Sequence, residues 1–137
     1  MTLYRSATMR YAYLSHDRPE LMFSSKELAR HMQAPDEVDM KMLYRAVRFL
    51  IEHPRVVQRF ERQVMPGGLV MYSDSDHAGC ADSRKSTSCT IAMLGKHTLK
   101  TQSTTQKVVA LSSAESEFYA VSKPALSVWV LHPYAKT

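Results

Sequence analysis

The sequence has 137 residues, 45% of them hydrophobic, which suits one ordinary domain or parts of two and excludes a disordered tail. Lysine and arginine total 18 against 13 acidic residues, and the resulting formal net charge of +5 permits a nucleic-acid partner without requiring one. No stretch approaches the ~20 apolar residues of a membrane span and the first residues lack a signal-peptide core, so we expect an intracellular protein, cytoplasmic or nuclear.

Two helices are expected before residue 35. The first lies within residues 1–18, where the apolar positions are Met9, Ala12 and Tyr13, with Leu14 as a further candidate. Proline suits the first turn of a helix because its missing N–H needs no partner there, so Pro19 opens the second helix. The residues at helical intervals along one face of that helix are Leu21, Ser25, Leu28 and Met32.

A third helix is expected to begin at residues 34–37 and to end at His53-Pro54, because the residue before a proline disfavours helical geometry. Asp36 and Glu37 then stand at the positive end of its dipole. Its apolar side consists of Leu43, Ala46, Val47 and Leu50. A basic stripe on the opposite side consists of Lys41, Arg45 and Arg48. This stripe can contact phosphates, although a solvated charged face is the ordinary explanation of such a pattern.

The clearest break in the chain is Pro66-Gly67-Gly68, where we place a domain boundary. Three strands are expected beyond it: Leu69–Tyr72, Cys89–Leu94 and His97–Gln102. The first of them is expected to be short and buried, because its residues are apolar. Gly95-Lys96 supplies the turn between the second and third strands. Sequential strands with tight connections favour an antiparallel meander. The capping pattern from Ser112 to Glu115 then opens a helix.

The two cysteines are not arranged as a metal or disulfide framework. Cys80 and Cys89 lie nine positions apart and form no Cys-x-x-Cys pair. We therefore expect two reduced thiols with structural roles.

Acidic residues gather where the first strand ends. Asp74, Asp76 and His77 fall within four positions, and Asp74 shares a face with Asp76 if the chain stays extended. Hard divalent cations such as Mg²⁺ prefer carboxylate oxygens, so this cluster is typical of a metal site. A solvated Ser/Asp turn is the competing interpretation.

Two further acids lie on the predicted last helix. Glu115 and Glu117 point about 200° apart around the helix axis, so only one can face the sheet. If Glu115 reaches back to cap the helix, Glu117 turns toward the strand that bears Asp74, and the two carboxylates can seat a cation. Exposed helix charges are the alternative explanation.

Six stretches follow one another in a distinctive order: Tyr4-Arg5-Ser6-Ala7, Arg18-Pro19-Glu20-Leu21, Arg45 to Leu50, Tyr72 to Gly79, Ser83 to Ser88, and Val109 to Phe118. In this order and spacing, the chain resembles the end of the reverse-transcriptase region and the start of the ribonuclease H domain in the Pol polyprotein of copia-type LTR retrotransposons. The resemblance extends from Tyr4 nearly to Leu131.

The resemblance implies an α/β (α+β) fold in two parts. Residues 1–65 correspond to the helical tail of the reverse transcriptase or connection region. Residues 66–137 correspond to the N-terminal half of a truncated ribonuclease H-like domain, with three antiparallel strands and then a helix. The implied partners are an RNA–DNA hybrid or other nucleic acid and the rest of the Pol polyprotein, with no membrane.

In that family, four acids hold two Mg²⁺ ions, or Mn²⁺ in their place, which cut the RNA strand of an RNA–DNA hybrid. Asp74 matches the first-strand aspartate and Glu117 matches the helix glutamate, so the resemblance assigns both to catalysis and metal binding. Asp76 matches an aspartate outside the four and remains an additional candidate ligand. The nucleic-acid contacts that we assign are Lys41, Arg45, Arg48, Arg84 and Lys85.

The other two acids are expected beyond Thr137, so we expect an incomplete site and leave open whether this chain is an enzyme. The alternatives to a nuclease fragment are a non-catalytic nucleic-acid-binding module and an inert element-derived fragment. Pro124 departs from the family pattern and predicts that the last helix ends or kinks near Ser122. Trp129 and its apolar neighbours are expected to form an apolar tail, and residues 132–137 match nothing in the family.

Overall fold

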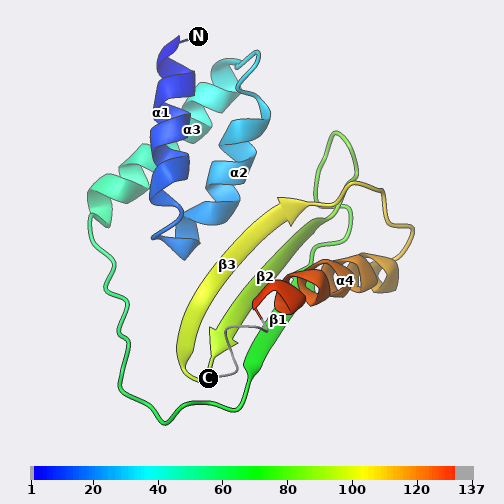
Figure 1. The fold of residues 1–137 in the computed structure, drawn as a ribbon. Coiled ribbons are helices and arrows are strands. Elements are labelled where there is room, and N and C mark those ends of the chain that lie inside the picture. Colours follow the sequence, from blue (N-terminus) through cyan, green and yellow to red (C-terminus); the bar gives the residue numbers. More distant parts are fainter. Residues whose placement is uncertain (1, 132–137) are drawn as a thin grey trace. The chain divides into compact units, whose positions relative to one another are not determined.

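A computed structural model describes residues 2–131, with side chains described as far as residue 122. The chain divides into two compact units, unit 1 (residues 1–58) and unit 2 (residues 59–137) (Figure 1). Unit 1 is helical, and unit 2 combines a three-stranded antiparallel sheet with one helix, so the α+β class is confirmed. The predicted boundary at 66–68 falls later than this division. No helix among the described residues is long and apolar enough to cross a bilayer.

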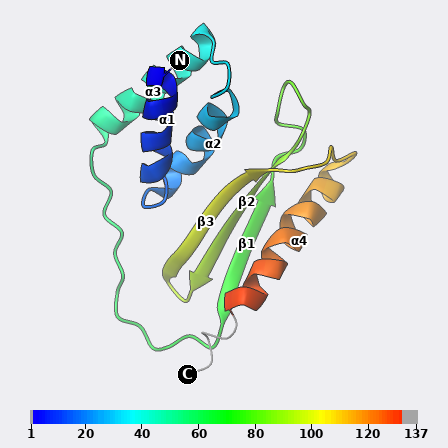
Figure 2. The ribbon, with the colours of Figure 1, turned by 45° about the horizontal axis from the view of Figure 1, so that its top comes forward.

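Unit 1 contains three α-helices and a short 3₁₀ turn, whose bounds are α1 (Thr2–Leu14), η1 (Pro19–Leu21), α2 (Met22–Arg30) and α3 (Glu37–Glu52) (Figure 2). They enclose one apolar cluster: Tyr4, Tyr11, Leu21, Leu28, Leu43 and Ala46. As predicted, Pro19 opens the second helical segment and its Leu21, Ser25 and Leu28 are buried. The segment begins as a 3₁₀ turn before it continues as α2.

The helix expected within residues 1–18 is confirmed as α1, and its buried residues are not the apolar positions noted in the sequence. Met9 and Tyr13 are 56% and 75% exposed, whereas Tyr4, Thr8 and Tyr11 are buried. The buried tyrosines find polar partners, since the Tyr4 hydroxyl donates to the Leu28 carbonyl oxygen at 2.8 Å and the Tyr11 hydroxyl lies 2.8 Å from Ser24 Oγ. A large ring whose hydroxyl has a hydrogen-bond partner is a good core residue, which explains why these two tyrosines are buried.

A reciprocal cap begins α3 where it was predicted to begin. Asp36 Oδ1 accepts from the Asp39 amide at 2.8 Å, and Asp39 Oδ2 accepts from the Asp36 amide at 2.9 Å. Asp39 is buried and its Oδ1 lies 2.6 Å from His31 Nδ1. Burial alone would raise the pKa of Asp39, but the bonds from Asp36 and His31 outweigh it and lower that pKa. Of the predicted apolar side, only Val47 is exposed, at 38%.

Residues 53–66 form neither helix nor strand, and part of this segment is fixed to the sheet of unit 2. The side-chain amide of Gln63 donates to the Leu94 carbonyl oxygen at 2.8 Å, and its Oε1 accepts from the Lys96 amide at 2.9 Å. His97 Nε2 lies 2.7 Å from the Glu61 carbonyl oxygen. These contacts bind the segment to the turn between the second and third strands.

Unit 2 is a three-stranded meander covered on one face by a helix (Figures 1 and 2). The elements are β1 (Leu69–Ser75), β2 (Thr87–Leu94), β3 (His97–Thr105) and α4 (Ser113–Leu131). The predicted meander and the Gly95 turn are confirmed, with Gly95 at φ 59°. The first strand is longer than predicted and is not buried, because it lies at the sheet edge with Val70 and Tyr72 exposed.

The last helix continues through Pro124 to Leu131, so it does not end near Ser122, and the alternative of a kink there stays a prediction. Proline fixes a φ that suits a helix, and the helix therefore continues at the cost of one missing hydrogen bond. The side chains of Trp129 and its neighbours, and the whole of residues 132–137, lie outside the described part, so the predicted apolar tail stays a prediction.

Candidate functional site

Asp74 lies within β1, opposite Cys89 of β2, and is exposed. The neighbouring Ser75 faces the helix, because its hydroxyl donates to Ser116 Oγ at 3.0 Å. Successive side chains of a strand point to opposite faces of the sheet. Asp74 therefore points to the face that α4 does not cover. It is the last residue but one of β1, so it lies inside the strand and close to the strand end where the sequence placed it.

Glu115 caps the start of α4, as predicted. Its amide donates to Ser112 Oγ at 3.1 Å, while its carboxylate accepts from the Leu111 amide at 2.7 Å and from the Tyr119 hydroxyl at 3.2 Å. The hydrogen bond and the charge of Glu115 raise the pKa of Tyr119. Glu115 is thus engaged in the cap. Glu117 is half-buried, as Glu115 is, and has no hydrogen-bond or ion-pair partner among the described residues.

A buried glutamine that sequence reasoning missed ties α4 to the sheet. The amide nitrogen of Gln106 donates to Ser88 Oγ at 2.9 Å and to the Ser116 carbonyl oxygen at 2.8 Å. Its backbone amide donates to the Ser86 carbonyl oxygen at 2.8 Å. With the Ser75–Ser116 bond, these contacts fix the start of α4 over β1 and β2. No local pattern marks Gln106, because its partners come from β2 and α4.

The carboxylate of Asp76 closes the loop between β1 and β2. It accepts a hydrogen bond from the Thr87 amide, and the Asp76 amide donates to the Thr87 carbonyl oxygen at 3.1 Å. Its other oxygen lies directly over Gly79, where an added Cβ would overlap it. Asp76 therefore has a structural role in this loop, and the suggestion that it also binds a metal stays a prediction.

In the part of the chain that the structure describes, no group of three or more His, Cys, Asp or Glu side chains is arranged to hold a metal ion. Asp74 and Glu117 are the two carboxylates that remain as candidate ligands. Mg²⁺ in phosphate chemistry is commonly held by one or two carboxylates together with water and substrate phosphates. Two carboxylates are too few to hold two ions by protein alone. Because Asp74 points away from α4, a single ion shared by Asp74 and Glu117 stays a prediction.

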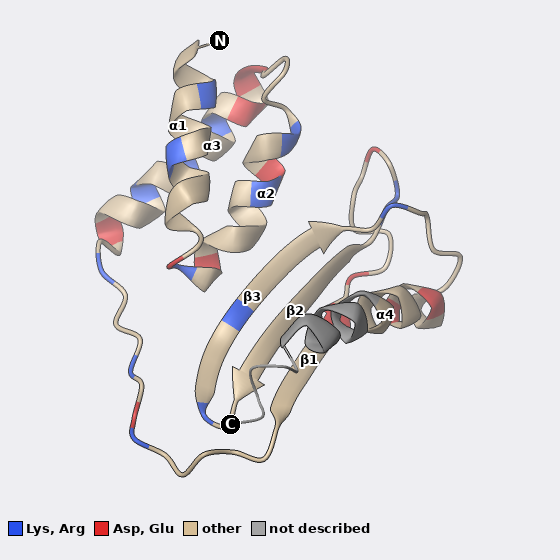
Figure 3. Cartoon of the chain, viewed as in Figure 1, with Lys and Arg blue, Asp and Glu red and all other residues tan. Residues whose placement is uncertain are grey.

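The basic stripe of α3 is exposed as predicted. Lys41, Arg45 and Arg48 form no ion pair with any residue described in unit 1. Figure 3 shows basic positions in blue along α3. In unit 2, Arg84 is exposed at φ 53° in the loop between β1 and β2, and Lys85 beside it is half-buried. Each unit thus presents cations toward solvent, and their contact with nucleic acid stays a prediction.

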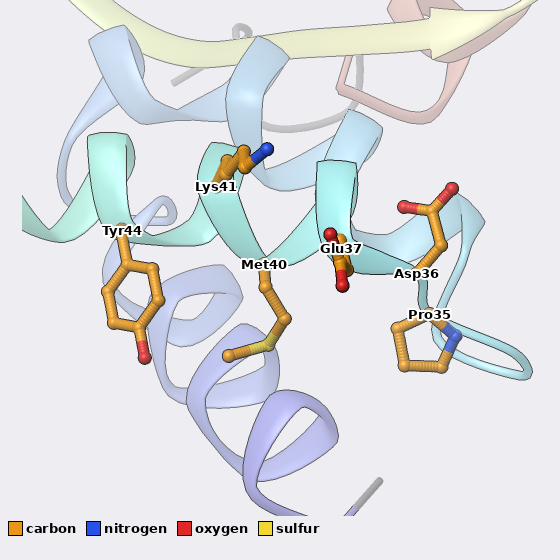
Figure 4. A pocket seen from close by; sticks show the side chains of 6 residues that line it. All are labelled: Pro35, Asp36, Glu37, Met40, Lys41 and Tyr44. Atoms are coloured by element: carbon orange, nitrogen blue, oxygen red, sulfur yellow. The ribbon is translucent and has the colours of Figure 1, made fainter.

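A shallow pocket of about 510 Å³ lies at the start of α3, between residues of both charge signs. Figure 4 shows Asp36 and Glu37 near one end of this pocket and Tyr44 at the other, with Lys41 between them. The two carboxylates line the same pocket as Lys41 and partly offset its charge.

Both cysteines are free thiols, as predicted. Cys80 is buried and its Sγ accepts from the Ser83 hydroxyl at 3.0 Å, which stabilises the loop that carries Arg84. Cys89 is exposed and lies on β2, where it pairs with Asp74 of β1. It therefore has no role in the core.

Comparison with known proteins relates the chain to transposon polyproteins. It is 32% identical over 130 residues to the retrovirus-related Pol polyproteins from transposons RE1 and RE2 of Arabidopsis thaliana. The match covers 94% of this chain but 9% of each relative, so the chain spans about a tenth of their length. It is also 33% identical over 114 residues to the secreted RxLR effector protein 161 of Plasmopara viticola, covering 82% of this chain and 80% of that protein. No protein-family model and no solved structure matches.

Proposed function

Because the chain belongs to the retrovirus-related Pol polyproteins of copia-type transposons, we propose that it contacts nucleic acid within such a polyprotein, and that residues 66–137 form the first part of a ribonuclease H-like fold. The observation that carries the proposal is the position of α4. Ser75 and Gln106 hold this helix over β1 and β2, with Asp74 on the strand and Glu117 on the helix. This order of elements is the one implied for a ribonuclease H-like unit.

An RNA–DNA hybrid is the substrate class that this assignment implies. β1 is an edge strand. For Asp74 and Glu117 to hold one Mg²⁺ or Mn²⁺ ion together with a phosphate of the hybrid, the Asp74 carboxylate would have to turn around that edge toward α4. When bound, such an ion supplies positive charge to the phosphate and lowers the pKa of a coordinated water. Two carboxylates do not satisfy two ions, so we expect this chain to bind a hybrid without cleaving it at a useful rate.

The binding itself is expected to be electrostatic. The exposed cations of α3 in unit 1 and of the Arg84 loop in unit 2 contact phosphates, which carry no sequence information. Each neutralised phosphate releases counterions, so the affinity falls steeply as the salt concentration rises.

The test uses the purified full chain and a fluorescently labelled RNA–DNA hybrid, with anisotropy measured from low to physiological salt. We expect affinity that falls with salt, and a smaller salt slope in the Arg45→Glu/Arg48→Glu double variant. The exposed pair Arg55→Glu/Arg59→Glu, outside α3, is the matched control. Affinity that is indifferent to salt, or absent at low salt, contradicts the proposal and favours an inert fragment.

Cleavage is assayed on the same hybrid with Mg²⁺ or Mn²⁺, beside Asp74→Asn as a control for contaminating nuclease. We expect intact hybrid with both proteins. Cleavage by the parent that disappears in Asp74→Asn would show a working site built from fewer acids than proposed.

A further inference from the structure

An apolar groove of about 410 Å³ runs between α2 and α3 of unit 1. This volume lies within the range of roughly 300–1,000 Å³ that small-molecule sites occupy. Its floor includes Leu28 and Ala46 from the core, and its walls include Phe23 of α2 with Met42 and Phe49 of α3. The groove can therefore accept a flat apolar group about the size of one or two rings.

Two aromatic rings from opposite walls stay available to solvent at this groove. Phe23 is 55% exposed and Phe49 is 38% exposed, although both line the groove. Lys26 Nζ lies over the Phe23 ring, 4.7 Å from its centroid, so a base can stack only on the other face of that ring. The Phe49 ring is already oriented, because it stacks on His53 at a centroid distance of 4.7 Å. Exposed, oriented rings are the platforms on which nucleobases stack.

The charges around the groove favour a polyanion. Arg45 lines it and Arg48 lies about one helical turn further along the same side, and neither forms an ion pair within the described part of unit 1. The two acids of the lining are already neutralised: Glu20 pairs with Arg18 at 2.7 Å, and Glu27 pairs with Lys26 at 2.8 Å. Arg30 adds a second bond to Glu27 at 3.0 Å. The unpaired charge at the groove is thus positive.

We propose that this groove holds a nucleobase of single-stranded RNA or DNA, stacked on Phe49 and Phe23, with the flanking phosphates on Arg45 and Arg48. The proposal rests on the proposed function in that both require the chain to bind nucleic acid. It adds that the affinity depends on the presence of bases, which phosphate contacts alone do not explain. A peptide helix would fill the apolar walls equally well but would leave the two arginines without partners unless it were acidic.

The test compares two labelled single strands of equal length and equal charge, one of oligothymidylate and one in which every nucleotide is abasic. Full-chain binding is measured by anisotropy at low salt. A stacked base contributes about 1–3 kcal/mol, so the base-bearing strand is expected to bind about 5- to 150-fold more tightly than the abasic strand. Phe49→Leu and Phe23→Leu each keep an apolar side chain but remove the ring, and each is expected to reduce this ratio without changing abasic affinity.

The matched control is Phe118→Leu, which removes an exposed ring of α4 in unit 2 and is expected to leave the ratio unchanged. Equal affinity of the parent for the two strands overturns the groove proposal, while salt-dependent hybrid binding in parallel would leave the proposed function standing. Loss of hybrid and single-strand binding together would overturn both. The proposal is also overturned if the phenylalanine variants, with unchanged circular dichroism, lose affinity for the base-bearing and the abasic strand equally. It is likewise overturned if the parent binds an acidic amphipathic peptide more tightly than it binds the base-bearing strand.

Discussion

Replacing Gln106 by methionine tests whether this side chain fixes α4 over the sheet. The two protons of its amide nitrogen serve the Ser88 hydroxyl and the Ser116 carbonyl oxygen, both within 3 Å. Methionine has a similar length and no donor, so it fills the space and leaves both acceptors without this partner. Any loss of stability then reports on the hydrogen bonds and not on a cavity.

The magnitude follows from the surroundings of the three groups. A net intramolecular hydrogen bond contributes about 1 kcal/mol, and a buried acceptor left without a partner costs about 1–3 kcal/mol. Ser88 is buried, so its hydroxyl cannot turn to water. Gln106 Oε1 has no partner in the described structure, and its removal offsets part of the cost. We expect a net loss of about 2 kcal/mol in unit 2, or on the order of 10 °C in its melting temperature.

Amide hydrogen exchange measured by mass spectrometry locates the effect. We expect faster exchange in peptides covering residues 113–122 of α4, and little change in unit 1. Gln102→Met, at an exposed position of β3, is the matched control. If Gln106→Met exchanges at the parental rate and melts at the parental temperature, the contacts of Gln106 do not fix the helix and the reasoning is wrong.

Three further outcomes are expected. Gly79→Ala should displace the Asp76 carboxylate and so remove its hydrogen bond with the Thr87 amide. We expect the free energy of unfolding, measured with urea, to fall by about 1–3 kcal/mol. An unchanged urea midpoint would contradict the role of Asp76. The pKa of Asp39 is lowered in the folded state, so its ionised form stabilises unit 1 above about pH 4, the ordinary pKa of an aspartate. This stability is lost as the pH falls through the folded-state pKa. Acid should therefore destabilise unit 1 less in Asp39→Asn than in the parent, when the stability of each protein in acid is compared with its own stability at neutral pH. Iodoacetamide should modify the exposed Cys89 before the buried Cys80, and the reverse order in peptide mass spectrometry would contradict the burial of Cys80.

Local signals in the sequence were sufficient for several elements. Pro19 opened a helical segment, the Asp36 cap and the proline after His53 bounded α3, and Gly95 formed the turn of the β2–β3 hairpin. The cap at Glu115 was also predicted correctly. Each of these features depends on the backbone conformation of a few consecutive residues, and therefore the residue types alone determine it.

The relations between distant residues were decided only by tertiary structure. The sequence did not identify the buried face of α1, because the hydroxyl partners of Tyr4 and Tyr11 come from α2. Nothing in the sequence marked Asp76 as the residue that closes its loop, because Thr87, which donates to its carboxylate, lies 11 positions away. Gln106 carried no signal at all, since its hydrogen-bond partners lie 10 and 18 positions away in the chain. Which acceptor a polar side chain meets depends on how the elements pack, and no window of neighbouring residues contains that information.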